Sequence, residues 1–158
     1  MKKIKILTLC AIFALVGNLN ANASTEISKI DTITTLPESR CNEHGYDWTK
    51  VIYAISQVES KGNPKAFNKN GNCAGLLQIT PVLVREANQI LAQRKSKTRF
   101  TMQDRFDPNK SKQMFILIQE KYNPTHNVEK AIRIWNGGPN YGIRSTQRYY
   151  EKVRSYLR

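Results

Sequence analysis

The chain has 158 residues and a formal net charge of +13 at neutral pH. This length is what one folded domain requires. A surface this basic should attract polyanions, whether nucleic acid, anionic lipid or an acidic cell-wall polymer, although the dispersed positions of lysine and arginine also fit ordinary solvated helix faces.

The first 23 residues are organised like a secretory signal peptide. The basic start Met1–Lys5 precedes an apolar run from Ile6 to Val16, and Ala21-Asn22-Ala23 supplies the small residues that signal peptidases recognise. Cleavage before Ser24 would leave 135 residues with a net charge of +10, because three lysines leave with the signal peptide.

An exported protein is therefore expected, in the periplasm, the cell envelope or the medium, and export makes nucleic acid the least suitable polyanion. A lipoprotein attached through Cys10 is an alternative, but the bulky Leu9 and the apolar stretch that continues after the cysteine argue against it. No later segment has the long apolar run that a membrane span requires.

Residues 24–42 are predicted to be a flexible lead, because they are rich in serine and threonine, contain Pro37 and lack aromatic residues. The folded domain is expected over residues 43–158. Cys41 and Cys73 remain after signal removal, in a compartment that tolerates disulfides. They form either a disulfide or two free thiols, since sequence does not give the geometry that a bridge needs.

Five helices are predicted from apolar residues at helical spacing. The first has Asp47 as a candidate N-cap. The second and third open at the cap-then-proline pairs Thr80-Pro81 and Asp107-Pro108. Short connections and few strand signals indicate an all-α domain with a single core. The predicted ranges are 47–60, 80–94, 107–122, from about 125–127 to 136, and 145–157.

Glu59 lies on the apolar face of the first predicted helix. An advance of about 100° per residue places it on one narrow arc with Trp48, Ile52 and Ile55. A poorly solvated carboxyl keeps its proton to higher pH, as a general acid near neutral pH must. The alternative, a solvated glutamate at a helix end that caps the following turn, stays open, because periodicity alone does not decide.

Two further groups carry side chains suited to sugars. Gly75 precedes a helix and would allow close backbone approach to a ligand, and Gln78 offers both a donor and an acceptor. Trp135 can present a flat face to a sugar ring and Asn136 a pair of hydrogen bonds. The alternative for the second group is a core tryptophan followed by a helix C-cap.

Four segments in order resemble the successive motifs of soluble lytic transglycosylases, which have the goose-type lysozyme-like fold. They are Glu59–Ala66, Gly75–Pro81, Ala131–Gly138 and Tyr149–Val153. The resemblance spans roughly residues 43–157, nearly the whole predicted mature chain. It implies a lysozyme-like domain that acts on peptidoglycan.

The same resemblance implies that Glu59 is the sole catalytic acid/base. Trp135 stands where the family usually has a tyrosine, which keeps the aromatic surface and loses the hydroxyl. The residues expected to bind substrate are Ser60, Gly75, Gln78, Trp135, Asn136 and Tyr149.

The implied reaction is non-hydrolytic cleavage between N-acetylmuramic acid and N-acetylglucosamine. Glu59 would protonate the bridging oxygen and then take the proton of the muramoyl 6-hydroxyl, which closes a 1,6-anhydro ring. Ordinary glycosidases need a second carboxylate, but here the tethered hydroxyl replaces a captured water. We interpret the other candidates, Glu86, Asp104 and Asp107, as structural residues at capping and surface-like positions.

Two rival functions stay open: a lysozyme-type hydrolase, and a catalytically silent glycan-binding module of an envelope apparatus. No motif indicates a metal or a cofactor, since His44 and His126 lack ligand spacing and no phosphate-binding glycine pattern occurs. We expect a monomer. The sequence does not distinguish internal cleavage from cleavage at chain ends.

Overall fold

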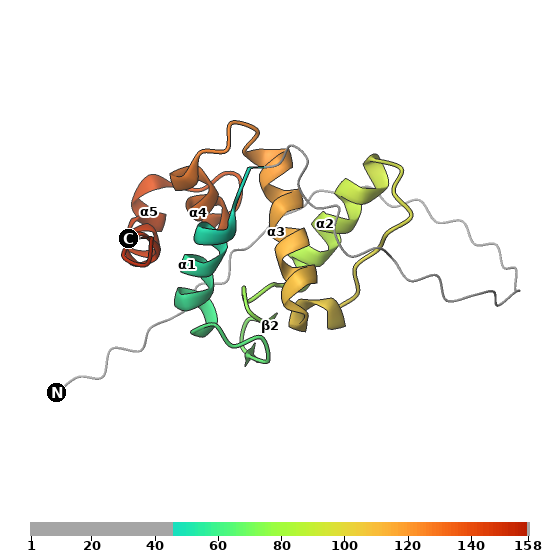
Figure 1. Ribbon diagram of the computed structural model, residues 1–158, viewed down its shortest axis with the longest axis horizontal. Coiled ribbons are helices and arrows are strands. Elements are labelled where there is room, and N and C mark those ends of the chain that lie inside the picture. The colour runs from blue at the N-terminus through green and yellow to red at the C-terminus, as the bar shows by residue number, and fades with distance from the viewer. Residues whose placement is uncertain (1–45, 158) are drawn as a thin grey trace, which may run out of the picture. The chain divides into compact units, whose positions relative to one another are not determined.

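The computed structural model describes residues 46–157, which form a helical domain (Figure 1). Within this range the chain has five α-helices, one short 3-10 helix and one two-stranded hairpin, so the expected all-α class is confirmed. The predicted signal peptide and lead, with Cys41 and His44, lie outside the described residues. The helices are α1 (Thr49–Ser60), α2 (Pro81–Gln93), η1 (Gln103–Phe106), α3 (Pro108–Tyr122), α4 (Val128–Gly137) and α5 (Ile143–Arg154).

The second, third and fourth helices start where local chemistry predicts. The Thr80 hydroxyl accepts a hydrogen bond from the Leu83 N–H at 3.2 Å, and Pro81 occupies the first turn of α2. The Asp107 carboxylate accepts two N–H groups at the start of α3, and the Asn127 side chain caps α4 by accepting the Lys130 N–H. Each cap satisfies amides that have no partner within the helix.

Two predicted helix starts are wrong, the N-cap of α1 by one residue and the start of α5 by two. Trp48, not Asp47, is the N-cap of α1, and the Asp47 carboxylate instead accepts the Thr49 N–H from outside the helix at 2.9 Å. α5 begins at Ile143, before the predicted Ser145, and ends at Arg154. Gly142 precedes α5, and its carbonyl accepts the Thr146 hydroxyl at 2.8 Å.

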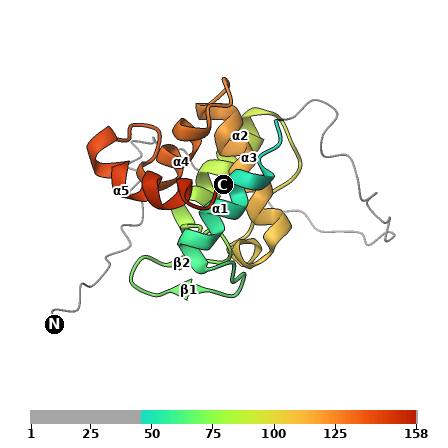
Figure 2. The ribbon, with the colours of Figure 1, turned by 60° about the vertical axis from the view of Figure 1, so that its left-hand side comes forward.

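A short hairpin follows α1, with β1 (Phe67–Asn68) antiparallel to β2 (Cys73–Ala74). The asparagine- and glycine-rich segment between the strands is its turn. The chain then continues through residues 75–79, named here the motif loop, into α2. The hairpin and the motif loop therefore lie directly after the end of α1 in the fold (Figure 2).

The core lies where α1 meets the other helices. Figure 1 shows α1 between the α4–α5 pair and α3, and side chains from all five helices form one buried cluster. The Phe115 ring of α3 packs against Trp48 and Trp135, with ring centroids 5.6 and 5.1 Å apart. In residues 46–157, none of the helices has the length and apolar character needed to cross a bilayer.

Candidate functional site

Glu59 and Tyr149 meet at the packed faces of α1 and α5. The Tyr149 hydroxyl donates a hydrogen bond of 2.7 Å to Glu59 Oε1, and both side chains are partly buried. The two residues are 90 positions apart in the chain, so only the packing of α5 on α1 brings them together.

Burial raises the pKa of Glu59 to about 7, from an ordinary value of 4.5. The hydrogen bond from Tyr149 acts in the opposite direction, because it favours the charged carboxylate, but it is the weaker influence. Burial and the nearby Glu59 charge raise the pKa of Tyr149 well above 10. At neutral pH the pair therefore has a neutral hydroxyl and a carboxyl that can either donate or accept a proton.

The position of Glu59 follows from where α1 ends. Ile52 and Ile55 on the same arc are buried, as predicted. Directly after Ser60 the backbone turns left-handed, with φ of 56° at Lys61 and 76° at Gly62. The helix thus stops one residue after Glu59, which leaves the carboxyl where the apolar face reaches the edge of the domain.

The motif loop is held by several of the predicted site residues. The Ser60 hydroxyl donates to the Leu76 carbonyl at 2.8 Å, and the Trp135 indole N–H donates to the Leu77 carbonyl at 3.3 Å. The Gln78 amide donates to the Gly75 carbonyl at 3.1 Å. Three of the motif segments therefore converge on this loop, through hydrogen bonds from α1, from α4 and from the loop itself.

Gly75 is required by the protein's own backbone. Its φ is +78°, and a Cβ there would lie 1.7 Å from the Arg105 carbonyl oxygen. The sequence suggested close approach to a ligand, but the close approach in the structure is to η1. A side chain at this position would push the motif loop away from η1.

Trp135 is only 7% exposed and packs on Phe115. This placement favours the alternative of a core residue over that of a sugar platform. Asn136 is partly buried and is not the C-cap, because α4 continues to Gly137 and is capped by Gly138. Among the described residues the Asn136 side chain makes no hydrogen bond, so both ends of its amide are open to a ligand.

The other candidate carboxylates have structural partners. Glu86 is not at a surface-like position but 3% exposed, and it accepts hydrogen bonds from Lys121 Nζ at 2.7 Å and the Tyr122 hydroxyl at 2.6 Å. Asp104 accepts the Thr101 N–H at 2.6 Å, and Asp107 caps α3. Their structural interpretation stands, and the predicted exposure of Glu86 was wrong.

Arg105 was not singled out from the sequence, although it organises the region behind the motif loop. It is 6% exposed, and its guanidinium donates to the carbonyls of Asn72, Ile79 and Met102 at 2.7, 3.2 and 2.9 Å. No local pattern marks an arginine whose partners are backbone carbonyls up to 33 positions away.

Cys73 is buried and disulfide-bonded, and its predicted partner Cys41 lies outside the described residues. His126 is exposed, with its ring centroid 6.1 Å from that of Trp48. Within residues 46–157, no three or more histidine, cysteine or acidic side chains gather as a metal site would require.

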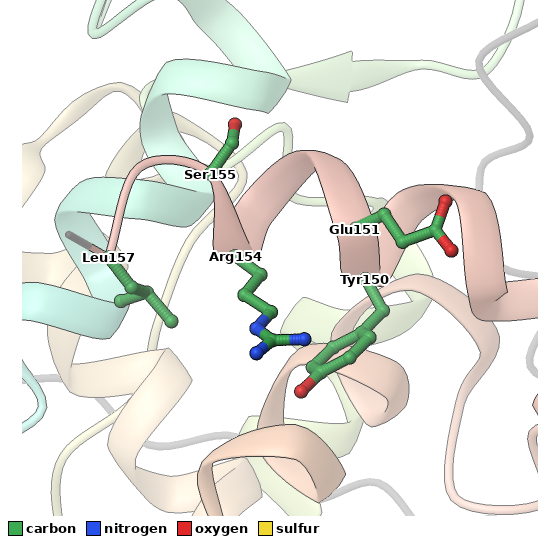
Figure 3. Close-up of a pocket in the computed structure, with 5 residues that line it drawn as sticks. All are labelled: Tyr150, Glu151, Arg154, Ser155 and Leu157. Carbon is green, nitrogen blue, oxygen red and sulfur yellow. The ribbon is translucent and has the colours of Figure 1, made fainter.

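A pocket of about 600 Å³ lies on another side of α5, and neither Glu59 nor Tyr149 lines it (Figure 3). The side chains of Tyr150 and Arg154 extend from the same side of α5, and that of Glu151 points away from Arg154. A smaller pocket of about 310 Å³ between the start of α1 and the C-terminal residues is also separate from the pair. The Glu59–Tyr149 pair therefore lines neither pocket.

Two comparisons with known proteins bear on the function of this site. A comparison with curated protein sequences finds no match to the chain. The model of one protein family, described as the transglycosylase SLT domain, matches residues 40–157. Members of this family are lytic transglycosylases, which act on peptidoglycan. The match covers all four motif segments and most of the chain, and the chain therefore belongs to the transglycosylase SLT domain family.

Proposed function

We propose that the chain is an exported peptidoglycan lytic transglycosylase in which Glu59 is the only catalytic acid/base. The observation that carries the proposal is a carboxyl with a pKa of about 7 whose one hydrogen-bond partner within residues 46–157 is a neutral hydroxyl. General acids and bases work best when their pKa lies near the working pH. Each of the other acidic candidates has structural partners: Glu86 is ion-paired with Lys121, Asp104 accepts hydrogen bonds from Thr101, and Asp107 caps α3.

One carboxyl is sufficient when the nucleophile belongs to the substrate. Protonated Glu59 gives its proton to the oxygen that bridges N-acetylmuramic acid and N-acetylglucosamine, and the bond from that oxygen to the muramoyl C1 breaks. The 6-hydroxyl of the same muramoyl unit forms the new bond to C1 and loses its proton to the Glu59 carboxylate. The acid is regenerated and no water is consumed, because proximity provides the nucleophile.

Tyr149 is suited to position Glu59 through both steps. Its hydroxyl donates to Oε1, which leaves Oε2 for the sugar oxygens. A neutral donor orients the carboxyl without fixing it in the charged form, as a lysine or arginine would. Asn136 lies on the last turn of α4, and its side-chain amide makes no hydrogen bond within residues 46–157. We propose that it binds the substrate's acetamido or hydroxyl groups.

The test is digestion of purified sacculi by wild type and Glu59→Gln, followed by mass spectrometry of the muropeptides. We expect wild type to release products one water lighter than those of a hydrolase, with anhydro ends, and Glu59→Gln to release almost none. Products with reducing ends would indicate a hydrolase. Binding to sacculi with no wild-type turnover would indicate a silent glycan-binding module.

Export is tested separately from the chemistry. The full-length chain is expressed in a Gram-negative host, and the envelope fraction is analysed by N-terminal sequencing. A mature N-terminus at Ser24 supports the proposed signal peptide, and uncleaved protein confined to the cytoplasm contradicts it.

A further inference from the structure

Three cations follow one another at four-residue intervals along α5. Arg144, Arg148 and Lys152 are all exposed, and we call them the α5 stripe. Four residues advance an α-helix by about 6 Å, so the three side chains share one face over roughly 12 Å.

The C-terminal end of the α5 stripe lies beside the candidate site, and the stripe turns away from it toward its N-terminal end. At about 100° per residue, Lys152 is about 60° from Tyr149 around the helix axis, Arg148 about 100° and Arg144 about 140°. Tyr149 points at α1, where its hydroxyl reaches Glu59. The stripe is therefore on the solvent side of the same helix that supplies the partner of the catalytic carboxyl.

None of the three stripe side chains makes a hydrogen bond or an ion pair with any of residues 46–157. The acid nearest to them on α5, Glu151, accepts a hydrogen bond from Gln147 at 2.9 Å. Arg154 is on the pocket side of α5 with Tyr150, outside the stripe (Figure 3). Elsewhere in the domain cations do find acids, in the pairs Arg94–Glu120, Lys121–Glu86 and Arg133–Glu129.

We propose that the α5 stripe binds the carboxylates of the peptide stem on the muramoyl unit that Glu59 cleaves. This proposal rests on the proposed function. The N-acetylated sugars of a glycan strand are neutral, so its negative charge comes from the stems. A stem is attached to the same muramoyl sugar whose C1 reacts at Glu59, and it must therefore leave the strand beside the site. Lysine and arginine at solvent-exposed positions bind carboxylates through charge-assisted hydrogen bonds.

The occupant is a peptide stem rather than a detached anionic polymer, because attachment to the reacting sugar brings it to this face at every turnover. The stripe would thus make the enzyme prefer strands that still carry their stems. It would act on binding of the strand and not on the proton transfers, which fall to Glu59 alone.

The variant is Arg144→Gln with Arg148→Gln and Lys152→Gln. A charge-matched control neutralises Arg85, Lys97 and Lys112, which are exposed, without hydrogen-bond partners in the described part of the chain, and located in or next to α2 and α3. Figure 1 shows these helices on the other side of α1 from α5. The substrates are sacculi with intact stems and glycan strands stripped of stems by an amidase, which leaves only the lactyl carboxylate on each muramoyl unit.

We expect the ratio of kcat/KM for stem-bearing over stripped strands to fall about tenfold in the stripe variant, through KM, and to stay constant in the control. Raising salt from 50 to 200 mM should reduce the wild-type ratio and leave the variant's ratio unchanged. An equal loss on both substrates, or no loss, would overturn the proposal.

A binding assay separates this proposal from the proposed function. Glu59→Gln protein, with and without the stripe substitutions, is sedimented with stem-bearing sacculi. If wild type makes no anhydro product, the proposed function fails while this assay still tests the stripe. Stem-dependent binding that is lost with the stripe supports it. Binding that depends equally on the stripe after the stems are removed overturns it and indicates the lactyl carboxylate or another wall polyanion as the ligand.

Discussion

Two glutamates in this domain have similar neighbours and opposite behaviour. Glu59 on α1 and Glu86 on α2 each accept a tyrosine hydroxyl, from Tyr149 at 2.7 Å and from Tyr122 at 2.6 Å. Within residues 46–157, only Glu86 also has a cation, Lys121 at 2.7 Å. Burial raises the pKa of Glu59 to about 7, whereas at Glu86 the lysine and tyrosine together outweigh burial and lower the pKa.

The comparison shows that the tyrosine does not decide the protonation state. A neutral donor offsets part of the cost of desolvation, and a full positive charge reverses it. The α2–α3 region therefore holds a permanent carboxylate that links two helices, and the α1–α5 region holds a carboxyl that can change its protonation state. That difference is the physical basis for proposing Glu59, and not Glu86, as the catalytic acid.

The largest expected effect comes from removing the acid itself. Glu59→Gln should lower kcat on sacculi by about 10³-fold, because general acid–base catalysis contributes roughly that factor. Glu86→Gln should retain most of the activity. Turbidity loss of a sacculus suspension gives the rates, and circular dichroism checks that both variants are folded. If Glu86→Gln were the inactive one, the roles of the two carboxyls would be reversed.

The second effect is a pH dependence of stability that belongs to Glu59. Its pKa is higher folded than unfolded, so its contribution to stability is complete below about pH 4.5 and is lost as pH rises through 7. Glu59→Gln has no such loss. We expect the unfolding free energy of Glu59→Gln, relative to that of wild type, to rise by up to about 3 kcal/mol between pH 4.5 and 8.

Urea unfolding at several pH values measures this difference. Asp47 offers a comparison of opposite sign, because hydrogen bonds with Thr49 lower its pKa. A constant gap between wild type and Glu59→Gln over this pH range would mean that the carboxyl is well solvated in the folded protein, and the proposed acid would lose its physical basis.

A smaller effect is expected when the structural glutamate loses its cation. Lys121→Met leaves Glu86, 3% exposed, with the Tyr122 hydroxyl alone. An uncompensated buried carboxylate is costly, and we expect a loss of about 2 kcal/mol at pH 7. Adding Glu86→Gln to Lys121→Met should restore part of the loss, as seen in urea midpoints. Equal stabilities of the single and double variants would contradict the paired-charge account.

Local chemistry explains which features were predictable from sequence. The pairs Thr80-Pro81 and Asp107-Pro108 mark helix starts, because the cap and the proline act within one turn. Apolar spacing alone placed Glu59 on the buried face of α1. Two helix boundaries were less accurate, at Asp47 and at Ser145, where no cap side chain with a proline beside it marks the start.

The rest depends on contacts between distant segments. The bond from Tyr149 to Glu59 joins positions 90 apart, and the pair Lys121–Glu86 joins positions 35 apart. No helical period tells which of two glutamates will meet a lysine. Gly75 was expected to approach a ligand, but its neighbour is Arg105, a residue without a local signal. Tertiary packing determines these contacts.

The smallest effect is the most specific to the site. Tyr149→Phe removes the donor that lowers the pKa of Glu59, so the alkaline limb of the kcat profile should shift upward from about pH 7 by about 0.5–1 unit, the equivalent of one hydrogen bond. Because the carboxyl also loses its orientation, kcat should fall about tenfold.

Tyr122→Phe is the matched control for this change, since it removes the corresponding hydroxyl from Glu86 and leaves Lys121 in place. Its pH–rate profile should coincide with that of wild type. A purely structural tyrosine at position 149 would lower kcat without moving the alkaline limb, because only a direct donor to the catalytic carboxyl changes the energy difference between its two protonation states. The limb therefore reports on the 2.7 Å hydrogen bond itself.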